Sequence, residues 1–98
     1  MLNPTPQARL LDPQGRPYFL WDCDLRDDTF RELLRDPDPQ VRAALVGKLM
    51  RQAKPDDVFQ YVTEREVRAL WTLVTPYLGQ TRAFWTWIFG AWEQMDAR

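Results

Sequence analysis

Hydrophobic and polar positions follow the period of an α-helix along most of this chain, because apolar residues recur three and four positions apart. The pattern is clearest between positions 64 and 78. The apolar residues that share one helical face there are Val67, Leu70, Trp71, Val74 and Leu78. No pair of segments alternates residue by residue as the two strands of a hairpin would. The chain is therefore predicted to be all-α, a compact bundle of about five short helices with an extended N-terminal lead-in.

Helix start and stop signals divide the chain at short intervals. Asp38 and Pro39 form one start signal, with Asp as the N-cap and Pro at the first helical position. Thr63 and Glu66 form a capping box, and Gly79 is suited to the C-terminal end of a helix. The predicted helices cover about residues 27–34, 39–52, 55–61, 64–78 and 81–95.

Residues 1–16 show no hydrophobic period and are predicted to form a flexible lead-in, extended or disordered. The turn-forming residues of this segment are Pro4, Pro6, Pro13 and Gly15. The short apolar run 17–21 is too isolated to build a sheet, so we expect an extended segment that packs on the helices. Residues 17–98 are then a single helical domain, which the length of 98 residues also indicates.

Charge and composition narrow the classes of partner. The chain has 13 Lys and Arg against 14 Asp and Glu, for a formal net charge of −1. A domain that binds nucleic acid or anionic membranes usually carries a basic excess, so the sequence argues against both. No apolar run approaches the roughly 18 residues of a membrane-spanning helix. The lone Cys23 permits no internal disulfide, which together with these points predicts a cytoplasmic protein.

Candidate catalytic and metal-binding groups are few. The chain has no His, which removes the commonest general base and metal ligand. Asp22 and Asp24 follow an apolar run as in phosphatases of the haloacid-dehalogenase type, but the alternating strands and helices that such chemistry requires are missing. With Asp27 and Asp28 they could also bind a divalent cation, yet the Gly and Glu of an EF-hand loop are absent. We therefore expect helix capping from these carboxylates, and no enzyme activity, metal or cofactor.

Arg42 falls inside the apolar arc of the helix predicted over 39–52. Two roles are open for it. In the first turn of the helix, its stem can lie along the apolar surface while the guanidinium reaches solvent. Alternatively, Arg42 is partly buried and pairs with Asp22, Asp24 or Asp36, which would brace two helices. Either role is structural.

The helix predicted over 81–95 is the best candidate binding surface. Its apolar residues fill an arc of about 160°, which is wide for one buried stripe in so small a domain. The residues of this arc are Phe84, Trp85, Ile88, Phe89, Ala91, Trp92 and Met95. Trp87 lies outside it. The helix is either a core helix with one partly exposed Trp or an anchor for a protein partner, since Trp, Tyr and Arg dominate interface hot spots. The predicted partner-binding residues are Arg82, Trp85, Trp87 and Phe89.

Several short motifs occur along the chain in a distinctive order. They are Phe19-Leu20-Trp21-Asp22, Leu33-Leu34-Arg35-Asp36-Pro37-Asp38, Pro55-Asp56-Asp57-Val58 with Tyr61-Val62, and Leu78-Gly79 followed by Arg82-Ala83-Phe84-Trp85. From Tyr18 to Trp92 the chain thereby resembles a family of small uncharacterised bacterial helical proteins. Members of that family are often encoded beside nucleotidyltransferase-like toxins of the AbiEii type.

This resemblance implies an antitoxin or accessory partner of a nucleotidyltransferase-like toxin, without catalytic residues of its own. The residues that match recurring positions of the family are Phe19, Trp21, Asp22, Arg82, Phe84 and Trp85. Core and capping roles would account for these positions equally well. We assign structural roles to Trp21, Asp22 and Arg42.

Two other functions stay open. The short helices around Thr63 could form a helix-turn-helix variant of a DNA-binding regulator. Against it, the segment 64–75 has only Arg65 and Arg68 as basic residues, whereas phosphate neutralisation needs several on one face. The aromatic helix near the C-terminus could instead pair with itself in a structural homo-oligomer. A protein partner is the primary prediction, and nucleic acid and membranes are not expected partners.

Overall fold

The computed structural model describes the backbone of residues 4–96 and the side chains of residues 4–91. Its α-helices and 3-10 helices (η) are, in chain order, α1 (Gln7–Leu10), η1 (Tyr18–Leu20), α2 (Asp27–Leu33), α3 (Pro39–Gln52), α4 (Pro55–Val58), α5 (Glu64–Ala69), α6 (Trp71–Val74), η2 (Thr75–Tyr77), η3 (Gly79–Thr81) and α7 (Arg82–Asp96). In this part of the chain, strand-like pairing is limited to one isolated antiparallel bridge between Leu11 and Pro17. The predicted all-α class is confirmed.

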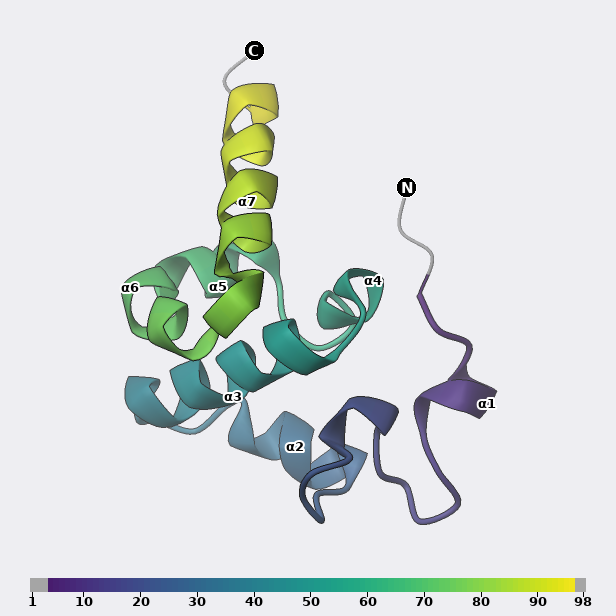
Figure 1. Cartoon of the computed structure of the whole chain (residues 1–98). Coiled ribbons are helices and arrows are strands. Elements are labelled where there is room, and N and C mark those ends of the chain that lie inside the picture. The colour runs from purple at the N-terminus through teal and green to yellow at the C-terminus, as the bar shows by residue number, and fades with distance from the viewer. Residues whose placement is uncertain (1–3, 97–98) are drawn as a thin grey trace.

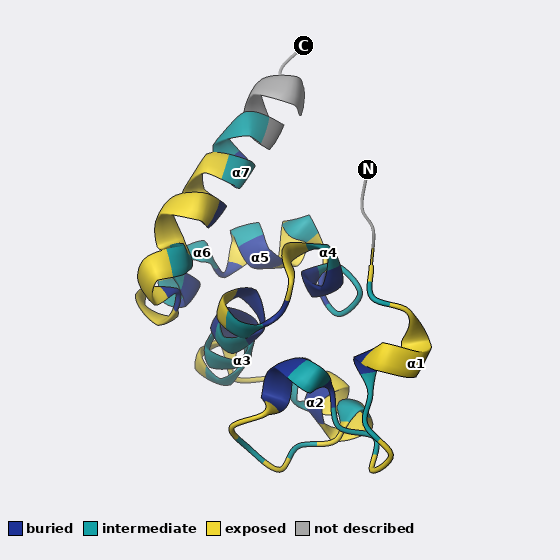
Figure 2. Ribbon diagram, turned by 45° about the vertical axis from the view of Figure 1, so that its right-hand side comes forward, coloured by how far each residue is buried: buried dark blue, intermediate teal, exposed yellow. Residues whose placement is uncertain are grey.

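Helix α3 lies at the centre of the bundle, with α2 and η1 on one side and α6 and η2 on the other (Figure 1). It begins where the sequence predicts, because the carboxylate of Asp38 accepts a hydrogen bond from the amide of Gln40 at 2.9 Å. The buried residues of this helix are Ala43, Val46, Gly47, Leu49 and Met50. Figure 2 shows buried backbone on α3 and on the elements that face it. Because α3 is covered from both sides, it supplies the shared core of the fold.

Aromatic rings fill the core between η1, α2 and the turn after α4. The ring of Phe19 packs edge-on against those of Tyr18, Phe30 and Tyr61, with centroid distances of 5.5, 5.6 and 5.3 Å. Edge-on pairs of this kind add about 0.5–1.5 kcal/mol each beyond the area they bury. Burial, together with the hydrogen bond that the Tyr61 hydroxyl donates to Asp27 at 2.6 Å, raises the pKa of Tyr61. We call the four rings the Phe19 cluster.

Asp57 is a charged residue that is fully buried. Its carboxylate accepts hydrogen bonds from the Thr5 amide at 2.7 Å, the Thr5 hydroxyl at 2.6 Å, the Tyr18 hydroxyl at 2.6 Å and the Gln60 side-chain amide at 2.8 Å. Burial on its own would raise the pKa of Asp57, but these donors outweigh burial and leave the pKa lowered. The carboxylate therefore joins the N-terminal segment, η1 and the turn after α4 through these neutral donors.

The N-terminal segment differs from the prediction. The sequence predicts no regular structure over 1–16, whereas the structure has the helical turn α1 and buries Leu10. After α1 the chain reverses at Gly15, whose φ of +80° is a conformation that favours glycine. The bridge between Leu11 and Pro17 closes this reversal. Sequence periodicity misses the segment because its order comes from distant contacts and not from a repeated apolar face.

The segment 17–21 also differs from the prediction, because η1 replaces the expected extended run. Trp21 is 76% exposed and does not contribute to the core, contrary to the structural role predicted for it. Asp22, which follows Trp21, contacts α3. It accepts hydrogen bonds from Lys48 at 2.6 Å and Gln52 at 3.3 Å, and the bond from Lys48 is the main cause of its lowered pKa. These bonds attach the end of η1 to α3.

Arg42 is half-buried, and its guanidinium donates hydrogen bonds to two backbone carbonyls. The acceptors are the carbonyl of Asp36 at 2.7 Å and that of Pro37 at 3.1 Å. The predicted alternative of an ion pair with Asp22, Asp24 or Asp36 is therefore replaced by contacts to the main chain. Carbonyls in the turn between α2 and α3 have no helical donor, so a long cationic side chain is well suited to satisfy them. Arg42 thereby attaches the first turn of α3 to the turn before it.

The helix predicted over 64–78 is divided into α5, α6 and η2. The break lies at Leu70, where φ is −103° and ψ is 8°. Further along, Pro76 has no amide hydrogen to donate to the carbonyl of Thr72. The hydroxyl of Thr75 donates to that carbonyl instead, at 3.4 Å. The missing amide explains why the last turn takes the tighter 3-10 form.

The observed helix starts agree with the predicted ones better than the observed helix ends do. The starts of α2, α3, α4, α5 and α7 lie within one residue of the predicted positions. Thr63 and Glu66 form the predicted capping box, with both hydrogen bonds present. The predicted helix over 55–61 ends early, at Val58, since the amides of Gln60 and Tyr61 bond three residues back and tighten the turn.

Gly47→Ala should destabilise the fold, because the added Cβ would overlap the Cβ of Tyr77 where η2 packs on α3. Overpacking of this kind costs about 1–3 kcal/mol, which urea unfolding followed by tryptophan fluorescence would measure. Gly90→Ala is the matched control, since no described atom beyond the adjacent backbone of α7 lies within 4 Å of the added carbon. We expect that variant to gain about 0.5–1 kcal/mol. Unchanged stability of Gly47→Ala would contradict the close packing of η2 on α3.

Acid should weaken the fold through Asp57. Its folded-state pKa lies below the ordinary value of 3.8, so the carboxylate stabilises the fold above that pH and loses this contribution as the pH falls further. Asp57→Asn should lower the free energy of unfolding at pH 7 by about 1–3 kcal/mol, since an amide NH2 would face hydrogen-bond donors. It should also flatten the pH dependence of unfolding between about pH 5 and 2. Asp24→Asn, at an exposed position, should change neither. Parallel acid curves for the wild type and Asp57→Asn would contradict an ionised Asp57.

Candidate protein-binding surface

Helix α7 carries the candidate surface and projects away from the rest of the bundle (Figure 1). Gly79, with a φ of +55°, allows the turn that redirects the chain after η2. The hydroxyl of Thr81 donates a hydrogen bond to the carbonyl of Leu78 at 2.6 Å, just before α7 begins. The direction in which α7 leaves the bundle is thus set by the turn at η3.

One face of α7 is fixed to the core by Trp85 and Phe89, which are both buried. Nε1 of Trp85 donates a hydrogen bond at 3.0 Å to the carbonyl of Met50, one of the last four carbonyls of α3. The ring centroid of Trp85 lies 6.1 Å from that of Phe59, and the centroid of Phe89 lies 5.2 Å from that of Trp71. We call these four rings the Trp85 cluster. It holds α7 against α3 and α6.

Arg68 adds a polar attachment between α5 and α7. Its guanidinium pairs with Glu64 at 2.6 Å and donates to the carbonyl of Phe89 at 3.2 Å. It also lies 5.5 Å from the centroid of the Phe89 ring. The side chain is about one-third exposed, so each of these contacts contributes about 1 kcal/mol at most. Arg68 therefore orients α7 more than it stabilises the fold.

The other face of α7 is apolar and exposed. Phe84 is 41% and Trp87 68% exposed, and Ile88 and Ala91 are half-exposed. These residues stand at positions i, i+3, i+4 and i+7, so they form one continuous stripe along the helix. Figure 2 shows exposed positions along the first turns of α7. We call the four residues the Trp87 stripe.

The four residues predicted to bind a partner fall into two groups. Trp85 and Phe89 belong to the core, so the prediction is wrong for them, because their rings are already covered by the Trp85 cluster. Arg82 and Trp87 are exposed, and their role stays a prediction. The sequence places Phe84 in the apolar arc and does not predict it to bind a partner. Its exposure and its spacing from Trp87 nevertheless place it in the stripe.

The wide apolar arc predicted for this helix is split along its length. Trp85 and Phe89 occupy the half that faces the bundle, and Phe84 lies in the half that faces solvent. Trp92 and Met95, which the sequence places in the same arc, lie outside the described side chains. A helical wheel identifies the arc but not which half is buried, because both halves carry aromatic residues.

The charge around the Trp87 stripe is low and positive. No acidic residue occurs in the sequence between positions 67 and 92, and the basic residues there are Arg68 and Arg82. Arg68 is engaged with Glu64 and α7, whereas Arg82 is exposed at the start of the helix. A complementary partner surface would therefore be an apolar groove with a neutral or acidic rim.

The acidic residues near α2 are dispersed into ion pairs. The pairs are Asp22–Lys48 at 2.6 Å, Asp24–Arg16 at 3.3 Å and Asp27–Arg31 at 2.8 Å. The predicted capping differs in detail, because the N-cap of α2 is Arg26 and makes no side-chain cap bond.

Among the described residues, no three metal-binding side chains gather at one point. Nor does any helix in that part of the chain have the length and apolar character needed to cross a bilayer.

No protein-family model, no curated protein and no solved structure matches this chain. The resemblance to a family of small bacterial helical proteins stays a prediction that rests on its motif residues alone. Among these, Phe19 and Trp85 lie in the two aromatic core clusters. Phe84 and Arg82 are exposed on α7, where they are accessible to a partner.

The two faces of α7 should respond differently to the same substitution. Trp85→Phe removes the indole donor from the Met50 carbonyl and leaves space in the core, so it should cost about 1–3 kcal/mol of unfolding free energy. Trp87→Phe, at an exposed position, should change stability by less than about 0.5 kcal/mol. Urea unfolding followed by circular dichroism measures both. Equal losses in the two variants would contradict this division of the helix.

Proposed function

We propose that this chain is a non-catalytic protein-interaction module that binds its partner through the Trp87 stripe of α7. The observation that carries the proposal is the exposure of Phe84 and Trp87 on one face of a helix whose other face is anchored in the core. Isolated exposed apolar residues are common on monomers, but a contiguous apolar patch usually marks an interaction site. The stripe is contiguous because its members follow the helical repeat.

The chemistry of the stripe suits recognition by a helix-binding groove. Apolar anchors at i, i+3, i+4 and i+7 are the pattern by which an amphipathic helix occupies such a groove. Trp is among the residues most enriched in interface hot spots. Truncation of a hot-spot residue typically costs about 2 kcal/mol or more of binding free energy. Arg82 at the start of α7 would supply a polar contact at the edge. Helix α7 also projects from the bundle, which makes the stripe accessible from several directions (Figure 1).

The resemblance supplies the kind of partner. We propose a nucleotidyltransferase-like toxin, with this chain as its antitoxin or accessory subunit. Such a role requires affinity and specificity but no catalytic group, in keeping with a chain that has no His. The lone Cys23 and the absence of an apolar run long enough for a membrane span favour the cytoplasm as the place where the two proteins meet.

Co-expression with the product of the adjacent gene, followed by size-exclusion chromatography and titration calorimetry, tests the proposal. We expect one co-eluting complex. Trp87→Ser should weaken it about tenfold or more, because a buried indole would be lost from the interface. The melting temperature of the isolated variant should stay close to that of the wild type, since Trp87 is exposed.

Trp21→Ser is the matched control, because Trp21 is also an exposed Trp, at 76%, but lies beside η1. Figures 1 and 2 both place η1 and α7 on opposite sides of α3. Trp21→Ser should leave the affinity unchanged. Two separate elution peaks, or equal effects of the two Trp variants, would overturn the proposal. A stable dimer of the isolated chain that Trp87→Ser dissociates would show that the stripe binds a second copy instead.

A further inference from the structure

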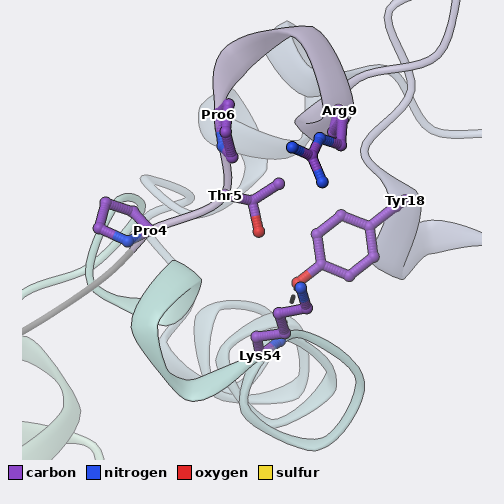
Figure 3. A pocket seen from close by; sticks show the side chains of 6 residues that line it. All are labelled: Pro4, Thr5, Pro6, Arg9, Tyr18 and Lys54. Carbon is purple, nitrogen blue, oxygen red and sulfur yellow. Dashed lines mark hydrogen bonds between the residues drawn. The ribbon is translucent and has the colours of Figure 1, made fainter.

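A hollow of about 460 Å³ lies where the N-terminal segment meets η1 and the residue before α4. Figure 3 shows its lining, which consists of Pro4, Thr5, Pro6, Arg9, Tyr18 and Lys54. The volume falls within the range of small-molecule sites. The hollow shares no residue with the Trp87 stripe, so an inference about it stands or falls independently of the proposed function.

The hydroxyl groups that line the hollow are already engaged in the fold. The Tyr18 hydroxyl donates to Asp57 at 2.6 Å and accepts from the Lys54 amide at 2.8 Å. The Thr5 hydroxyl donates to Asp57 at 2.6 Å. Burial and the bond to Asp57 raise the pKa of Tyr18 to about 12, so its hydroxyl is neutral at physiological pH. Tyr18 therefore offers a ligand the apolar surface of its ring, beside the rings of two prolines (Figure 3).

Two cationic side chains remain available at the hollow. Arg9 from α1 and Lys54 from the residue before α4 are both exposed, and neither forms an ion pair within residues 4–91. Asp57 lies behind this lining, and its buried carboxylate accepts four hydrogen bonds from Thr5, Tyr18 and Gln60. None of these bonds comes from Arg9 or Lys54. Arg9 and Lys54 thus give the lining two positive charges in a chain whose formal total is −1.

We propose that this hollow binds an organic phosphate, a phosphate monoester held by Arg9 and Lys54 with its organic part against the ring of Tyr18. A guanidinium binds a phosphate through paired N–H donors, and an ammonium binds it as a point charge. A phosphate monoester carries a charge of about −1.5 to −2 at neutral pH, which matches the two cations. A carboxylate would balance only one of them. Both cations are exposed, so the affinity is modest and falls with added salt.

Titration of the isotope-labelled full chain with phenyl phosphate, at constant ionic strength, tests this proposal by two-dimensional NMR. We expect saturable shifts confined to the amides of Thr5, residues 7–9, Tyr18 and Lys54. Arg9→Gln and Lys54→Gln should each weaken binding roughly tenfold, as expected for loss of a charged hydrogen bond. Arg65→Gln is the matched control, because Arg65 is an exposed arginine on α5 outside the lining. It should leave the affinity unchanged.

Inorganic phosphate and benzoate separate the two parts of the ligand. Both should bind more weakly than phenyl phosphate, the first because it lacks the ring and the second because it carries one charge. The proposal is overturned if no saturable shift appears, if Arg65→Gln weakens binding as much as Arg9→Gln, or if either of these simpler anions binds as tightly as phenyl phosphate. The spectra of the free variants show directly whether each one is folded.

Discussion

Helix α3 ends inside the fold, and side chains from distant parts of the sequence satisfy the polar groups at its end. The last four carbonyls of a helix have no donor within it. The indole of Trp85 donates to one of them, at Met50, and the first free amide beyond the helix, at Lys54, donates to the Tyr18 hydroxyl. The side-chain amide of Gln52 donates to a carbonyl of η1. The bond from Trp85 is buried, and a buried polar group left unpaired costs about 1–3 kcal/mol, so α7 is required where α3 stops. The bonds of Lys54 and Gln52 attach η1 at the same place.

Hydrogen bonds extend from this point to the N-terminal segment. The Tyr18 hydroxyl donates a hydrogen bond to the buried carboxylate of Asp57, which also accepts hydrogen bonds from the amide and the hydroxyl of Thr5. A proline-containing segment without an apolar period is thereby ordered by polar contacts. Neutral donors stabilise the carboxylate as well as a salt bridge would, and no cation has to be buried. For the same reason Arg9 and Lys54 stay at the surface, where they can meet a ligand.

The sequence predicts those features of this fold that depend on near neighbours. Asp38 and Thr63 mark helix starts correctly, because each side chain accepts from an amide two or three residues away. The order of the N-terminal segment depends on contacts between distant residues and leaves no local signal. The helix break at Leu70 has no breaking residue in the sequence to mark it. The residues of the candidate site are likewise predictable only where their environment depends on near neighbours. Periodicity predicts an aromatic helix with Trp87 exposed, but the burial of Trp85 follows from a hydrogen bond to a residue 35 positions earlier.

The two faces of α7 are linked by the geometry of the helix. Successive residues are about 100° apart, so a helix that directs Trp85 toward α3 must direct Phe84 and Trp87 away from it. The exposure of these two rings is therefore a consequence of the anchor and not a fault in packing. Burying the part of them that faces water would be worth about 2–3 kcal/mol, a large amount beside the 5–15 kcal/mol that typically separates folded from unfolded domains. A polar residue at position 87 would serve the isolated fold equally well, since Trp85 and Phe89 fix the helix and the ring of Phe84 packs edge-on against that of Trp85 at a centroid distance of 5.2 Å. The exposed indole surface of Trp87 thus adds little to the monomer, and most of its stabilising effect is available only to a complex.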